Sequence, residues 1–179
     1  MYDNHIEQLF EPGKNYLYVD VGGGSTEINL ISEGELKSSR SYNIGTVRML
    51  SGMVKNEEKE QMHTDLEVLA KEYAPIHIIG SGGNINKLFR LADKKDKKQL
   101  FLPLASLQDI YRTLKDLPKE QRIKLFKLKP DRADVIVPAA EIFMEVATRV
   151  QANGIIVPTI GLSDGIIDSL YTKNRQWMQ

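Results

Sequence analysis

The sequence predicts one mixed α/β domain with a five-stranded sheet and helices on both faces. Three β-like segments near the N-terminus are joined by very short links, so they must pair as antiparallel neighbours. Farther along, amphipathic helices alternate with two short apolar strands, an order that favours parallel crossovers and helices packed on the sheet. The 179 residues match the length of one ordinary domain and show no linker of domain-boundary character.

The three-stranded meander has distinct signals in each strand. Residues 16–21 (YLYVDV) are aromatic and β-branched, as in a buried strand. Residues 25–32 alternate polar and apolar side chains, and this period of two indicates a second strand rather than a helix. The turn-forming letters SEGE then lead into a third strand over residues 35–43.

The remaining strands and helices follow from apolar runs and helical spacing. The two further strands are PIHIIG (residues 75–80) and GIIVP (residues 154–158), and DKKDKKQL (residues 93–100) reads as a charged surface loop. Pro138 is expected to kink or restart the longest helix. The predicted helical segments are residues 44–53, 57–73, 84–92, 106–127, 132–153 and 161–171.

Composition narrows the classes of function. Cysteine is absent, which excludes disulfides and thiolate metal sites. Lys plus Arg equals Asp plus Glu at 24 each, so bulk charge gives no sign of a nucleic-acid partner. No apolar run is long enough to span a membrane, and the first residues lack the pattern of a signal peptide. A soluble cytoplasmic protein is the expectation.

The three glycines of VGGGSTE predict a phosphate-binding β-hairpin. Such loops bind anions because backbone N–H groups can point at them without a Cβ in the way. A P-loop would require a Lys after the last glycine, and a dinucleotide fingerprint would require a following helix; this loop has neither. The alternative is an ordinary tight turn in which Asp20 bonds local N–H groups.

Two carboxylates flank this hairpin. Asp20 ends the first strand and Glu27 lies just past the turn on the facing strand. Carboxylates beside a phosphate repel it unless a cation intervenes, and Mg²⁺ binds through one or two carboxylates and water. The pair therefore predicts a magnesium site.

A second glycine loop, Gly80-Ser81-Gly82-Gly83, follows a buried strand and precedes a helix. That position offers free N–H groups and the positive end of the helix dipole. Ligands of open α/β sheets bind at the carboxyl ends of strands, where both glycine loops are expected. Two such loops suggest a ligand with several phosphates, or with one phosphate and another group.

Five motifs in order resemble the exopolyphosphatase / guanosine pentaphosphate phosphohydrolase (Ppx/GppA) family. They are VDVGGGSTE, YNIGTVRM, IIGSGGNINKL, RADVIVPAAEIF and GLSDGII, which together extend from about residue 16 to residue 171. The resemblance implies an RNase H-like, actin-like fold in two halves with the active site between them. This chain resembles the second half as one domain over residues 1–179, with residues 1–14 near the hinge.

The resemblance also implies roles for individual residues. Asp20 matches the family's metal-binding aspartate, and Glu27 matches a catalytic glutamate that helps to hold the metal or water. Arg48 of the IGTVR motif could grip phosphate, with a structural ion pair as the alternative. Ser163 replaces an arginine frequent in the family's closing motif. The implied phosphate-binding residues are Gly22, Gly23, Gly24, Ser25, Thr26, Arg48, Gly80, Ser81 and Gly82.

The implied activity is release of a terminal phosphate from inorganic polyphosphate or guanosine pentaphosphate, assisted by Mg²⁺. The family's presumed catalytic glutamate in an SGxEEA-type segment has no match in this sequence. The isolated chain is therefore expected to be inactive and to need a first lobe, with a homodimer as a further possible assembly. Two alternatives are a nucleotide-binding lobe of another actin-like ATPase or kinase, and a non-enzymatic polyphosphate-binding module.

Several other polar residues are assigned structural roles. Arg132 and Asp134 are expected to cap and stabilise the long helix near whose start they lie. His5, His63 and His77 are too far apart in the sequence to form a local pair of metal ligands, and His77 is expected to be a structural residue within a strand.

Overall fold

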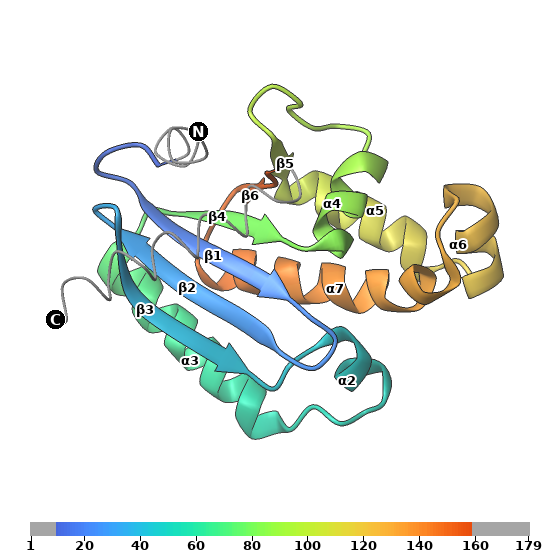
Figure 1. The fold of residues 1–179 in the computed structure, drawn as a ribbon, viewed down its shortest axis with the longest axis horizontal. Coiled ribbons are helices and arrows are strands. Elements are labelled where there is room, and N and C mark those ends of the chain that lie inside the picture. The colour runs from blue at the N-terminus through green and yellow to red at the C-terminus, as the bar shows by residue number, and fades with distance from the viewer. Residues whose placement is uncertain (1–9, 159–179) are drawn as a thin grey trace, which may run out of the picture.

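The computed structural model describes residues 10–158, which form one six-stranded sheet with helices packed against it (Figure 1). The strand order is β3-β2-β1-β4-β6-β5. The strands are β1 (Asn15–Val21), β2 (Thr26–Ser32), β3 (Glu35–Tyr42), β4 (Ile76–Ser81), β5 (Phe101–Pro103) and β6 (Gly154–Ile156). The helices are α2 (Thr46–Leu50), α3 (Asn56–Tyr73), α4 (Gly83–Leu91), α5 (Leu104–Lys115), α6 (Lys119–Phe126) and α7 (Pro130–Arg149).

The pairing confirms the mixed α/β class. Strand β2 lies between β1 and β3 and is antiparallel to both, with a register shift between Leu30 and Ile31. Strand β4 pairs in parallel with β1 and with β6, as the helical crossovers predict. The meander and the two later strands thus join in one continuous sheet.

The expected number of strands is wrong by one. Strand β5 immediately follows the predicted charged loop and pairs antiparallel with β6 at the edge of the sheet. It has only three residues, too few for a period of two to be recognised. It ends in Pro103, which lacks an N–H and is therefore tolerated at an edge.

Helix α7 also differs from its prediction. It begins at Pro130, two residues earlier than expected, with proline in the first turn, where the missing N–H has no intrahelical partner to lose. The helix continues through Pro138 to Arg149, so it does not restart there. Pro138 lies within a buried stretch of α7, and packing on the sheet holds the helix together across it.

The sheet has two chemically different faces because alternate residues of a strand point to opposite sides. Leu17, Val19 and Val21 of β1 join the main core with side chains from α3, α4, α5 and α7. Tyr16 and Tyr18 face the other way and join a smaller cluster. Figure 1 shows α3 and α7 behind the sheet. The helix expected over residues 161–171 lies outside the described residues, as do His5 and Ser163.

Within residues 10–158, no helix has the length and apolar character needed to cross a membrane. The part of the predicted lead-in segment that the structure describes packs onto the start of the sheet. There, the ring of Phe10 meets the ring of Tyr16 edge-on at 5.0 Å.

His77 of β4 is expected to make the stability of the fold depend on pH. Its ring lies 5.7 Å from that of Tyr16, and burial together with the charge of Lys14 lowers the pKa of His77 below its usual value of about 6.5. The unfolded chain then binds this proton more readily, so stability should fall as pH decreases through the unfolded pKa. We expect His77→Phe, which keeps a ring beside Tyr16, to flatten this dependence in urea unfolding between pH 7 and 5. An unchanged slope would contradict this role.

Candidate phosphate-binding site

Two glycine loops meet at one edge of the sheet. The hairpin of Gly22, Gly23 and Gly24 follows β1, and Gly82 follows β4. Because β1 and β4 are parallel neighbours, their carboxyl ends lie side by side. The tertiary structure therefore brings together two loops that are about sixty residues apart in the sequence.

A row of polar residues crosses four strands beside these loops. Asp20 is in register with Glu27 on one side and with Ser81 on the other, and Glu27 is in register with Ser41. Residues in register share a face, so both carboxylates project from the face that carries Tyr18. Asp20 and Glu27 are both half-buried. The structure thus places the two predicted metal-binding residues next to each other.

Two hydroxyl groups orient the Glu27 carboxylate. Its Oε1 atom accepts a hydrogen bond from Ser25 Oγ at 2.7 Å and another from Ser41 Oγ at 3.2 Å. These bonds restrict rotation of the carboxylate and leave Oε2 for other interactions. Ser25 lies within the predicted hairpin. Ser41 was not predicted, because only the strand register places it beside Glu27.

The backbone of α2 holds the hairpin by its carbonyl groups. The N–H of Thr46 donates to the Gly22 carbonyl at 3.0 Å. The N–H groups of Val47 and Arg48 donate to the Gly23 carbonyl at 3.0 and 3.1 Å. The predicted IGTVR motif thus has a structural explanation, since its helical turn orients the glycine loop.

The Arg48 side chain braces the same loop. Its Nε donates to the Gly24 carbonyl at 2.9 Å. Across residues 10–158 it forms no ion pair with a carboxylate, so the alternative of a structural ion pair is wrong there. The rest of the guanidinium lies beside the hairpin, 3.9 Å from where a side chain at Gly24 would begin.

Gly45 of the IGTVR motif and two of the predicted phosphate-binding residues, Thr26 and Gly80, have packing roles. A Cβ on Gly45 would lie 2.3 Å from the Gly23 carbonyl oxygen, so only glycine allows the two backbones to approach. The fully buried Thr26 hydroxyl donates to the Ile44 carbonyl at 2.6 Å. Gly80 lies inside β4 against the core, where a Cβ would meet Ile155 at 2.8 Å. The Thr26 hydroxyl and the close packing at Gly80 therefore have structural roles, and a phosphate contact by either residue stays a prediction.

The second glycine loop lies next to Asp20. Gly82 precedes α4 with a φ of 108°, a conformation that favours glycine. A side chain at this position would begin 3.5 Å from Asp20 Oδ1. The start of α4 is thus next to the aspartate at the end of β1.

Arg132 belongs to this site, contrary to its predicted capping role. Its guanidinium packs on Gly83, and its Nη1 donates to Asn84 Oδ1 at 2.7 Å. Asp134 instead pairs with Lys119 of α6 at 2.6 Å. Neither side chain caps α7. The contacts of Arg132 and Asp134 are made with other helices, so the helical spacing of the sequence could not predict them.

The donor set fits a magnesium ion. Within residues 10–158, no group of three or more His, Cys, Asp or Glu side chains could enclose a metal. Mg²⁺ does not need such a cage, because it keeps several waters and binds through one or two carboxylates and substrate phosphates. Asp20 and Glu27, on adjacent strands beside the glycine loops, would provide those carboxylates.

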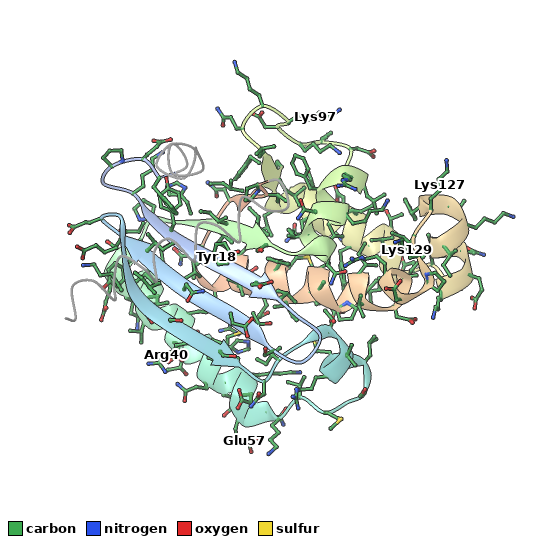
Figure 2. The ribbon with its side chains drawn as sticks, in the orientation of Figure 1. Tyr18, Arg40, Glu57, Lys97, Lys127 and Lys129 are labelled. Atoms are coloured by element: carbon green, nitrogen blue, oxygen red, sulfur yellow. The ribbon has the colours of Figure 1, made fainter. Side chains whose placement is uncertain are left out.

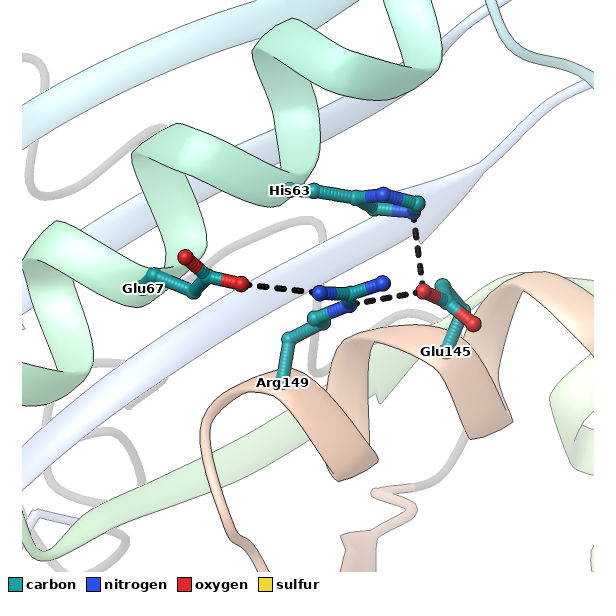
Figure 3. A network of polar contacts seen from close by, with 4 residues as sticks. All are labelled: His63, Glu67, Glu145 and Arg149. Atoms are coloured by element: carbon teal, nitrogen blue, oxygen red, sulfur yellow. Dashed lines mark hydrogen bonds and ion pairs between the residues drawn. The ribbon is translucent and has the colours of Figure 1, made fainter.

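His63 belongs to a polar network away from the glycine loops (Figure 3). Its Nε2 lies 2.8 Å from Glu145 Oε1, and Arg149 Nε reaches the same oxygen at 2.9 Å. Arg149 also pairs with Glu67 at 2.8 Å. The network links α3 to α7, which is a structural role.

A cleft of about 630 Å³ lies at the opposite end of the sheet, among residues that include Pro75, His77, Phe101 and Asn153. It borders the amino-terminal ends of the parallel strands, where open α/β sheets do not usually bind ligands. The glycine loops, by contrast, follow the carboxyl-terminal ends of the parallel strands β1 and β4. We therefore place the candidate site by its chemistry and not by the size of a hollow.

The mixed sheet with two glycine loops at one edge defines a domain of the actin-like ATPase fold class. A model of the Ppx/GppA phosphatase family matches residues 5–174. The chain belongs to this family.

Similar proteins and solved structures support membership of this family. Exopolyphosphatase 2 of Mycobacterium tuberculosis, in strains CDC 1551 / Oshkosh and H37Rv, is 28% identical over 188 residues, covering 92% of this chain and 58% of the relative. The type II variant of the Aquifex aeolicus Ppx/GppA phosphatase superimposes with a TM-score of 0.69 at 27% identity, covering 94% of this chain and 60% of that one.

An exopolyphosphatase from Cytophaga hutchinsonii shares the fold, with a TM-score of 0.69 at 22% identity, over 88% of this chain and 57% of that one. The chain therefore spans less than two thirds of the length of these relatives.

Proposed function

We propose that this chain is the second lobe of an exopolyphosphatase-type phosphohydrolase. The enzyme would release terminal phosphate from inorganic polyphosphate or guanosine pentaphosphate. The observation that carries this proposal is the row of Asp20 and Glu27 beside two glycine loops. Family membership and the name of the mycobacterial relative support it.

The hairpin has the donors that a phosphate requires. Its carbonyl groups are directed toward α2 and Arg48. Within residues 10–158, the N–H groups of Gly23, Gly24 and Ser25 donate to no backbone carbonyl, so they could donate to phosphate oxygens. The guanidinium groups of Arg48 and Arg132, beside the first and second loops, would add positive charge.

Asp20 and Glu27 would hold Mg²⁺, which when bound would offset the charge of the phosphates. The Ser25 and Ser41 hydroxyls keep the Glu27 carboxylate oriented for that task. A general base for the attacking water would come from a first lobe. We accordingly expect residues 1–179 alone to bind phosphate chains without hydrolysing them. Cytoplasmic location and homodimerisation remain predictions.

Phosphate release from three substrates tests the proposal. With Mg²⁺, the native protein that carries this chain should release phosphate from long-chain polyphosphate or guanosine pentaphosphate faster than from ATP. Chelation with EDTA should abolish the release. Release from ATP alone would favour the nucleotide-binding alternative, and binding without release would favour a non-enzymatic module. Efficient hydrolysis by residues 1–179 alone would contradict the proposal that the general base comes from a first lobe.

A further inference from the structure

We propose that three exposed lysines between α6 and α7 bind the outlying phosphates of a linear polyphosphate and make the site selective for long chains. We call Lys124, Lys127 and Lys129 the lysine corner. The inference rests on the proposed function, because it assumes that the terminal phosphates lie at the glycine loops. It adds a second contact region outside the predicted motifs.

The segment that contains the lysine corner has an excess of positive charge. Residues 115–132 contain seven Lys or Arg and three Asp or Glu, whereas the whole chain is neutral. Four of the cations make contacts elsewhere. Lys119 pairs with Asp134, and Arg122 donates to the carbonyls of Leu114 and Ala133. Lys115 lies over the ring of Tyr111, and Arg132 donates to Asn84. The lysine corner remains, and in the described part of the chain no carboxylate pairs with any of its three members.

The lysine corner is held close to the candidate site. Lys129 immediately precedes α7, and three residues later Arg132 reaches the second glycine loop at Gly83. The Lys119 and Arg122 contacts fasten α6 to the first turns of α7. Figure 2 shows Lys127 and Lys129 at the α6 end of the molecule. Cations therefore continue outward from the second glycine loop.

The chemistry of the lysine corner suits an inorganic phosphate chain, which carries no nucleobases. Lysine is a compact point charge that contacts phosphate without demanding a fixed geometry. Proteins that bind single-stranded nucleic acids add aromatic side chains on which bases stack. The large apolar side chain exposed here is Leu125, at 62%, whereas Phe126 packs against the core. A flexible inorganic chain fits this surface better than a nucleotide chain does.

Binding of long-chain polyphosphate and tripolyphosphate to residues 1–179, measured by calorimetry at several salt concentrations, tests the inference. We expect Lys124→Gln/Lys127→Gln/Lys129→Gln to weaken binding of the long chain by roughly tenfold and to reduce its salt slope by about one per lysine. Tripolyphosphate, which occupies only the glycine loops, should bind as before. Lys94→Gln/Lys97→Gln is the control, since Figure 2 shows Lys97 on a different loop, at another edge.

The outcomes separate this inference from the proposed function. If tripolyphosphate does not bind the unmodified chain at all, the proposed function fails. If tripolyphosphate binds but the lysine-corner variant holds long chains as well as the control does, only the present inference is overturned. It is also overturned if the corner variant loses both ligands equally. Equal or tighter binding of single-stranded poly(U) through the same lysines would replace polyphosphate by RNA as the partner.

Discussion

Asp20→Asn and Glu27→Gln should each lower the rate of phosphate release by the native protein on the order of 100-fold, the usual loss when one transition-state contact is removed. The two carboxylates lie in register on adjacent strands, so each would contribute half of a two-carboxylate magnesium site. Both replacements keep the shape of the side chain and remove its charge. The measurement is phosphate release at increasing Mg²⁺, and the concentration needed for half-maximal rate should rise in both variants.

Glu35→Gln provides the matched control. Glu35 is also a strand glutamate, but it is exposed at the start of β3 and pairs with Lys37. Its replacement should change neither the rate nor the Mg²⁺ requirement, because surface ion pairs contribute little. If Glu27→Gln behaved like this control, Glu27 would have no part in holding metal. Circular dichroism would verify that all three variants are folded.

Gly45→Ala should destabilise the fold by about 2–4 kcal/mol and abolish tripolyphosphate binding. The new Cβ would lie 2.3 Å from the Gly23 carbonyl oxygen, and backbone atoms cannot move aside as a flexible side chain can. Relief of this clash must separate α2 from the hairpin and break the bonds from Thr46 and Val47. Urea unfolding and calorimetric binding measure the two effects.

Gly24→Ala is the control within the same hairpin. A Cβ there would approach nothing closer than Arg48 Nη2 at 3.9 Å, so stability should change by less than about 1 kcal/mol. If Gly45→Ala were equally mild and also left tripolyphosphate binding unchanged, α2 would not be the element that orients the hairpin. Loss of phosphate binding in Gly45→Ala with unchanged stability would still support that orienting role, since small shifts of the donors are enough to weaken binding.

Much of the site could be predicted because its signals are local. The glycine triplet, Asp20 and Glu27 lie within eight residues of one another, and the strand that follows the triplet begins among them. A period of two assigns Asp20 and Glu27 to definite faces of their strands, and a tight turn forces those strands to be neighbours. Hence the adjacency of the carboxylates followed without knowledge of the tertiary structure, and the register of β1 and β2 confirms it.

Other residues carry no local signal. Arg132 joins the second glycine loop, and Ser41 reaches Glu27, only because helices and strands distant in sequence pack together. Gly80 and Thr26 look like ligand-binding residues in a linear motif, but in the structure they serve packing against the core and the IGTVR loop. A three-residue edge strand such as β5 is stabilised by its partner β6 and not by its own pattern.

The sequence by itself determined the mixed α/β class, the glycine hairpin and the pair of carboxylates, because short-range periodicity and turn geometry specify them. The tertiary structure alone decided which groups surround that hairpin. Packing of α2 directs the hairpin carbonyls inward, packing of α7 brings Arg132 to the second loop, and packing of α6 places the lysine corner beyond it. These relations depend on contacts between segments far apart in the chain, and no local pattern encodes such contacts.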